Sequence, residues 1–231
     1  MRFPQPPRRR VRRAIYILLA LFCLNIARYA VWPPVGGLAE KNPQTTAFIE
    51  YRKEEWRDAG QDKTIQQTWK PLRSISPSLA KAVVVAEDSR FREHGGFDLV
   101  GMKEALERNI ARKRLAAGGS TITQQLAKNL YFSPEKSLVR KAQEALVALR
   151  LEHALTKERI LELYLNCVEW GDGVFGAEAA ARRHFGVGAG SLTPYQAACL
   201  AAMLPSPRTR TPKSAFVRRQ AATIMARMRI E

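Results

Sequence analysis

The chain has 231 residues, of which 46% are hydrophobic, so it can bury one sizeable core and is not a wholly disordered protein. Its formal net charge of +17 predicts an anionic partner, such as nucleic acid, membrane phospholipid or a phosphorylated substrate. Cys23, Cys167 and Cys199 show neither CxxC nor Cys/His spacing, which argues against a disulfide framework and a structural zinc site.

An arginine-rich arm, residues 1–13, precedes an apolar stretch at residues 14–32. As a helix this stretch is about 28 Å long, close to the hydrocarbon thickness of a bilayer. Asn25 and Arg28 interrupt its second half, and no A-x-A cleavage site follows it, which favours an uncleaved anchor over a signal peptide. The arginines predict a cytoplasmic N-terminus, with the rest of the chain on the other side of the membrane.

The basic arm could also be taken for a nucleic-acid contact. Because it lies directly beside a membrane span, a topology signal and a contact with anionic lipid explain it better. No zinc finger, RNA-recognition motif or basic zipper accompanies it. We therefore expect the bilayer to be a partner and nucleic acid not to be one.

Residues 33–70 are predicted to be a juxtamembrane connector without assigned secondary structure, and residues 71–231 an all-α domain. A helix is expected to open at Pro77 or Ser78 and to hold Glu87 in its last turn. Strand alternation is nearly absent. The residues expected to cap or precede further helices are Asp98, Thr121 (with Gln124), Ser137, Thr156, Thr193 (with Gln196) and Ser214.

Glu87 and Asp88 follow an apolar run and open the motif AEDSRFREHGGFD. A solvated acid pair at a helix end is the ordinary explanation. However, a carboxylate at the edge of a buried helix is partly desolvated, which raises its pKa and suits it to act as a general base. Phe91 and His94 are candidates to shield it from water, and with Asp88 they are assigned to substrate binding.

A second polar cluster lies in GGSTITQQLAKNLYF, residues 118–132. A Gly-Gly turn leading into a capped helix exposes backbone N–H groups and the positive end of the helix dipole, which favours an anion or a sugar hydroxyl. Helix capping alone accounts for only two of the polar residues. The candidate binding residues are Ser120, Thr121, Gln124, Gln125, Lys128 and Asn129.

Glu144 lies on a predicted helix that is apolar nearly all round, in SPEKSLVRKAQEALVALRLE. A buried carboxylate needs partners, and Arg140 and Lys141 are placed one turn before it. A plain intrahelical ion pair is the alternative. The proximity of Lys128 and Lys136 in the sequence favours a cation-rich site instead.

Two carboxylates beside several cations indicate glycosyl transfer, which needs a base for the attacking hydroxyl and stabilisation of the leaving group. A glycosidase protonates the sugar oxygen and therefore needs a second carboxylic acid. A pyrophosphate leaving group needs positive charge instead. The residue types favour the pyrophosphate.

Five segments in order, AEDSRFREHGGFD, GGSTITQQLAKN, RKAQEALVALRLE, KERILELYLN and GDGVFGAEAAARRHFG, resemble the sequence blocks of the peptidoglycan glycosyltransferase family. The resemblance covers roughly residues 75–205 and is closest to the monofunctional biosynthetic type. It implies a lysozyme-like α-helical fold. It also implies polymerisation of lipid II into β-1,4 glycan strands, with inversion and with undecaprenyl pyrophosphate as leaving group. The expected location is the bacterial inner membrane, with the catalytic domain in the periplasm.

The same resemblance implies residue roles. Glu87 matches the general base, and Glu144 matches a second glutamate that stabilises the pyrophosphate, either directly or through Mg²⁺ or Mn²⁺. Lys136 stands where many members have arginine. It keeps the positive charge but cannot donate the two parallel hydrogen bonds of a guanidinium, so its role is left open. Residues 99–117 match a mobile, partly membrane-dipping lobe. The implied pyrophosphate-binding residues are Lys128, Arg140 and Lys141, and the implied donor-site residues are Ser120, Thr121, Gln124 and Gln125.

Two other functions are weighed against this one. A degradative muramidase or lytic transglycosylase is also helical and uses a glutamate, but has less need of the cations. A non-catalytic, membrane-anchored protein that binds cell-wall precursors is the third hypothesis. We expect lipid II and the growing strand as ligands, other cell-wall synthesis proteins as further partners, and no organic cofactor.

Overall fold

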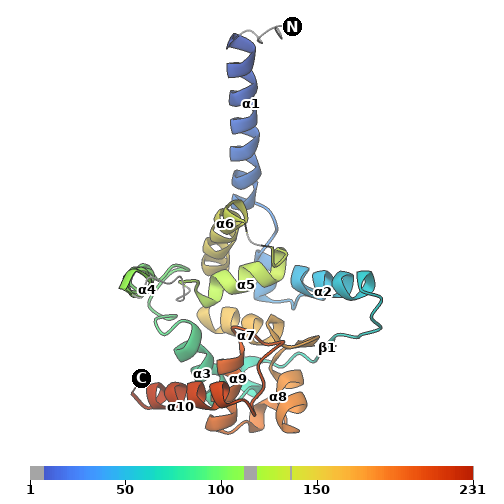
Figure 1. Cartoon of the computed structure of the whole chain (residues 1–231), viewed down its shortest axis with the longest axis vertical. Helices are drawn as coiled ribbons and strands as arrows, with labels where there is room; N and C mark the ends of the chain where they lie inside the picture. Colours follow the sequence, from blue (N-terminus) through green and yellow to red (C-terminus); the bar gives the residue numbers. More distant parts are fainter. Residues whose placement is uncertain (1–7, 112–118, 136, 231) are drawn as a thin grey trace.

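The computed structural model describes residues 8–111, 119–135 and 137–230, so Lys136 and part of the predicted lobe lie outside the described residues. The described chain is mainly helical, as predicted, and the N-terminal helix projects from the remaining ones beside α6 (Leu138–Ala154) (Figure 1). The α-helices, in chain order, are α1 (Arg8–Ala27), α2 (Ala47–Asp58), α3 (Pro77–Glu87), α4 (Leu99–Ala111), α5 (Ile122–Tyr131), α6 (Leu138–Ala154), α7 (Lys157–Cys167), α8 (Ala177–Phe185), α9 (Pro194–Met203) and α10 (Ala215–Ile230).

The core lies where α5 packs on α6 and α7, and where α3 packs on α9 and α10. Leu126, Leu151, Leu163 and Leu200 are completely buried there. The predicted helix starts are confirmed by their caps, because each capping side chain accepts a backbone N–H of the first helical turn. The confirmed caps are Asp98, Thr121, Ser137, Thr156, Thr193 and Ser214.

A small sheet packs beside the helices. Its three strands are β1 (Gln66–Gln67), β2 (Glu169–Gly171) and β3 (Val174–Phe175), in the order β1-β3-β2. β1 runs parallel to β3, with Gln66 opposite Val174, and β2 is antiparallel to β3. Strands this short leave almost no alternating pattern, so the sequence does not predict them.

Helix α2 and strand β1 lie within residues 33–70, the predicted connector. α2 packs on α5 and buries Phe48, Ile49, Arg52 and Trp56. These residues share one helical face, and Thr46 caps the helix by accepting from the Ile49 N–H at 3.1 Å. The spacing of these residues was therefore an available signal for this helix.

Helix α1 carries the predicted anchor. Residues Val11–Ala30 form a span of 20 residues with a mean hydropathy of 1.4, long and apolar enough to cross a membrane. Gln143 of α6 donates to the side-chain oxygen of Asn25 at 2.6 Å, and Arg150 donates to the backbone oxygens of Tyr29 and Val31. A polar residue that interrupts the apolar stretch is thus a contact between the anchor and the domain.

Helix α4 presents large apolar side chains to the outside. Leu99, Leu106 and Ile110 are 73%, 58% and 68% exposed. The described part of the chain therefore leaves these three apolar side chains largely uncovered.

Candidate active site

Glu87 and Glu144 line the same cavity, which has a volume of about 270 Å³. Glu87 is the last residue of α3, and Glu144 lies in the middle of α6. The structure therefore brings together the two glutamates that the sequence analysis selected, from segments far apart in the chain. The other lining residues are Ser120, Gln124, Gln125, Lys128, Lys141, Leu204 and Pro205.

Glu87 is held by a neutral amide. The Gln125 side-chain nitrogen donates to Glu87 Oε2 at 2.8 Å, and no ion pair within the described residues involves this carboxylate. Burial raises the pKa of Glu87, against the hydrogen bond from Gln125 and the positive charges of Lys128 and Arg210, which lower it. The result is a partly desolvated carboxylate that binds a proton more readily than a free one, as a general base should.

Tyr164, which is not among the predicted site residues, orients this amide. Its hydroxyl donates to Gln125 Oε1 at 2.9 Å, so the amide nitrogen of Gln125 faces Glu87. Burial raises the pKa of Tyr164 well above its ordinary value, which keeps this donor protonated. The available signal was a phenol on the apolar face of α7, one turn after Ile160 and Leu161, where a buried hydroxyl needs a partner.

Asp88, by contrast, has a structural partner on each oxygen. Asp88 Oδ2 accepts from the Ile122 N–H at 3.0 Å, and Oδ1 lies 2.8 Å from His94 Nε2. Because the Gly96 N–H donates to His94 Nδ1, the ring proton is on Nε2 and is donated to Asp88. Burial raises the pKa of Asp88, while the bonds from His94 and Ile122 oppose that rise.

These contacts change the expected roles of several predicted residues. The start of α5, which we expected to bind an external anion, already has the carboxylate of Asp88 on its Ile122 N–H. Phe91 is 0% exposed and belongs to the hydrophobic core, so it makes no surface that a substrate can touch. Asp88 does line a second cavity of about 190 Å³, which also borders Glu87 and Thr121.

Thr121 and Gln124 are also engaged in the fold. They form a capping box, and the Thr121 hydroxyl donates to the backbone oxygen of Gly96 at 2.7 Å. Gln124 still lines the main cavity, whereas Asn129 lines a neighbouring one of about 580 Å³. Ser120 accepts a hydrogen bond from Lys141 at 2.8 Å, which joins the two predicted blocks at the cavity.

Glu144 has cations on both oxygens. Its side chain is 2% exposed, with Arg140 Nη1 at 2.5 Å from Oε1 and Lys141 Nζ at 3.4 Å from Oε2. Arg140 does not line the cavity, so it acts on the cavity through Glu144. Arg140 Nε is buried and has no hydrogen-bond partner within the described ranges.

Lys128 lines both the main cavity and its neighbour. Burial lowers the pKa of Lys128, and the charges of Arg140 and Lys141 lower it further, whereas Glu144 and Glu87 raise it. The Lys128 ammonium is partly desolvated and interacts electrostatically with both glutamates, so it is well placed to bind an anionic group.

The described side chains do not form a complete metal site. In the described part of the chain, no group of three or more His, Cys, Asp or Glu residues could hold a metal ion. Both oxygens of Glu144 are paired with cations, which compete with a metal for the same lone pairs.

One partly desolvated carboxylate and one cation-paired carboxylate, around a single cavity of an α-helical domain, define a group-transfer enzyme that acts on an anionic donor. The sequence comparisons agree with this class. Residues 54–229 match the family described as Transglycosylase, and the chain belongs to that family.

Similar proteins cover most of this chain. A protein of Aromatoleum aromaticum is 50% identical over 198 residues, covering 85% of this chain and 84% of its own length. One of Azoarcus sp. is 49% identical over 193 residues, with 83% of each chain covered. One of Alcanivorax borkumensis is 44% identical over 220 residues, covering 94% of this chain and 87% of its own. All three are named biosynthetic peptidoglycan transglycosylase, which confirms the family predicted from the sequence.

Proposed function

We propose that this protein is a membrane-anchored peptidoglycan glycosyltransferase that polymerises lipid II into β-1,4-linked glycan strands. The observation that carries the proposal is the shared cavity, in which Glu87 and Glu144 lie with Lys128 and Lys141. Membership of the Transglycosylase family supports the same activity. A degradative lytic function is less favoured, because the relatives are named as biosynthetic enzymes.

In the proposed mechanism, Glu87 accepts the proton of the 4-hydroxyl of the acceptor GlcNAc. The oxygen then attacks the anomeric carbon of the donor, the bond to the pyrophosphate oxygen breaks, and the configuration inverts. The raised pKa of Glu87 favours this proton transfer, and the bond from Gln125 keeps the carboxylate oriented.

The departing undecaprenyl pyrophosphate needs positive charge in place of a proton. Lys128 and Lys141 line the cavity and supply it directly. Glu144 fixes the position of Lys141, and Arg140 balances the charge of Glu144. A divalent cation is proposed only as a companion of the pyrophosphate, where it would add positive charge, and the mechanism above needs none.

We propose that α1 crosses the bacterial inner membrane once, with the N-terminus in the cytoplasm and the domain in the periplasm. The arginines before the span and its hydropathy of 1.4 support this orientation and location. Docking of α1 on α6 through Asn25 and Gln143 supports a position of the cavity close to the headgroups, where the lipid carrier lies. The exposed apolar face of α4 is suited to contact the same bilayer.

The test is incubation of the full-length protein in lipid vesicles with labelled lipid II. We expect long strands that a muramidase digests. Release of fragments from intact cell wall, without polymer from lipid II, would instead establish the lytic function. Binding of lipid II without either product would establish the non-catalytic one.

A further inference from the structure

The loop that follows α9, residues 204–209, forms a wall of two cavities. Leu204 and Pro205 line the active-site cavity. The whole loop also lines the neighbouring cavity of about 580 Å³, opposite Phe48 and Arg52 of α2. Lys128 lies in both cavities, so the position of this loop sets the width of the cleft on both sides of Lys128.

The opposite wall consists of α2 and the turn between β2 and β3, which are fixed to each other. Arg52 donates three hydrogen bonds of 2.8–3.2 Å to Glu169, and these side chains are 9% and 4% exposed. At the turn, Gly173 has a φ of +74°, and a Cβ built there would lie 2.5 Å from the Trp56 ring. The turn therefore packs directly on α2, and a side chain at Gly173 would not fit.

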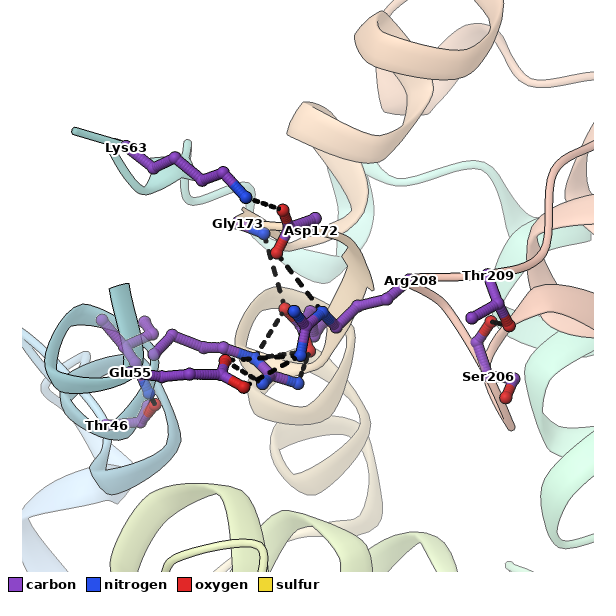
Figure 2. Close-up of polar contacts among 11 residues, drawn as sticks. Thr46, Glu55, Lys63, Asp172, Gly173, Ser206, Arg208 and Thr209 are labelled. Atoms are coloured by element: carbon purple, nitrogen blue, oxygen red, sulfur yellow. Dashed lines mark hydrogen bonds and ion pairs between the residues drawn. The ribbon is translucent and has the colours of Figure 1, made fainter. Parts of the chain in front are cut away.

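Arg208 joins the loop to this wall. Its Nη1 lies 3.2 and 3.3 Å from the two carboxylate oxygens of Glu55, and its Nε lies 3.3 Å from Asp172 Oδ1 (Figure 2). Arg52 holds Glu55 at 2.6 Å, and Lys63 holds Asp172 at 2.7 Å. Within the described residues, the ion pairs between the loop and the opposite wall all come from Arg208.

The loop keeps its own turns independently of these ion pairs. The Ser206 N–H donates to the Met203 oxygen at 2.9 Å, and the Arg210 N–H donates to the Ser206 oxygen at 3.0 Å. Removing the Arg208 side chain should therefore leave the turns intact and release the loop as a unit from α2.

We propose that Arg208 is a positioning residue, which holds the 204–209 loop against α2 and the β2–β3 turn and thereby fixes the cleft around Lys128. This inference rests on the proposed function, because the width of the cleft matters only when lipid II and the growing strand occupy it. Arg208 acts through the loop, and it lines the neighbouring cavity but not the cavity that the two glutamates share.

The kinetic test compares Arg208→Ala with the wild-type protein in vesicles containing lipid II. We expect the KM for lipid II to rise about threefold to tenfold, with shorter strands and with kcat within about twofold, since the glutamates are untouched. Arg208→Lys should recover part of the effect, because an ammonium keeps the charge but cannot bridge two carboxylates in the same way.

Lys63→Ala is the matched control. It removes the other ion pair of Asp172, of similar exposure, but leaves both carboxylate partners of Arg208 in place. We expect wild-type KM and strand length for this variant. A KM and strand length in Arg208→Ala equal to those of the wild type, or an equal change in Lys63→Ala, would overturn the proposal.

Hydrogen–deuterium exchange gives a readout that does not depend on activity. Amides of residues 206–210 should exchange faster in Arg208→Ala, and at the wild-type rate in Lys63→Ala. Unchanged exchange in Arg208→Ala would contradict the positioning role. If the wild-type protein made no polymer, the proposed function would fail, whereas the exchange result would still decide whether Arg208 holds the loop.

Discussion

Glu87 at the end of α3 is bonded to the neutral amide of Gln125, whereas Glu144 in the middle of α6 is bonded to Arg140 and Lys141. Both side chains border one cavity. The first carboxylate is desolvated, has no paired cation among the described residues, and has a raised pKa. The second is 2% exposed and has a cation on each oxygen.

This difference shows how one type of side chain can serve two purposes in one cleft. Desolvation without a counter-charge makes a carboxylate a better proton acceptor and costs folding free energy. A carboxylate that is buried together with two cations neutralises part of their charge. Removing it leaves those cations without a counter-charge. The variants below test this contrast through activity and stability together.

Glu87→Gln should have the largest effect on activity, a loss of about 10²–10⁴-fold in kcat, because an amide cannot accept the proton. Its effect on stability should be neutral or favourable. The folded protein binds a proton at Glu87 more tightly than the unfolded chain, so ionisation at neutral pH costs stability, and glutamine removes that cost. Polymerisation assays and thermal unfolding check the two parts. A clear fall in Tm would contradict the stability part.

Glu144→Gln should act in the opposite direction on stability. It breaks a buried pair and leaves Arg140 without its counter-charge, at a cost of about 3–5 kcal/mol. For a domain of this size that corresponds to a fall in Tm of about 2–4 °C per kcal/mol. Thermal unfolding of both glutamine variants at one pH gives the comparison. Equal Tm values for the two would refute the contrast.

Gln125→Leu should change the pH dependence of the reaction. The hydrogen bond from Gln125 lowers the pKa of Glu87, so its loss raises that pKa and moves the acidic limb of kcat/KM to higher pH. Tyr164→Phe should shift the acidic limb of kcat/KM in the same direction but by less. This variant keeps Gln125 and only removes the hydrogen bond that orients its amide. The measurement is the pH profile of kcat/KM for each variant, and a shift to lower pH would be inconsistent with the proposed arrangement.

Removal of divalent cations should have the smallest effect. Since Lys128 and Lys141 already supply positive charge at the cavity, we expect a chelator to reduce the rate less than Lys128→Ala does. Polymerisation with chelator, and after adding back Mg²⁺ or Mn²⁺, checks this expectation. Complete loss of activity with the chelator alone would show that the two lysines are insufficient.

The features that could be predicted from the sequence are those set by neighbouring residues. The capping boxes at Thr121 and Thr193 need only a residue and its partner three positions later, and both are present. The pair of Arg140 with Glu144 follows in the same way from one helical turn.

The features that could not be predicted depend on residues brought together by the fold. Arg52 and Glu169 lie 117 positions apart, and nothing near either residue indicates the other. The hydrogen bond of Asp88 to the start of α5 joins residues 34 positions apart, so this structural role could not be read from its own motif. The burial of Phe91 likewise depends on packing that its own motif does not specify.

The hydrogen bond between Asn25 of α1 and Gln143 of α6 lies one residue before Glu144. A catalytic domain joined to its membrane helix by a flexible linker would sample many heights above the lipid surface. It would meet its lipid-linked substrate only at some of them. A docked anchor instead sets one working height for the catalytic centre. Replacing the anchor with a leucine-only helix would then keep the protein in the bilayer while letting that height drift.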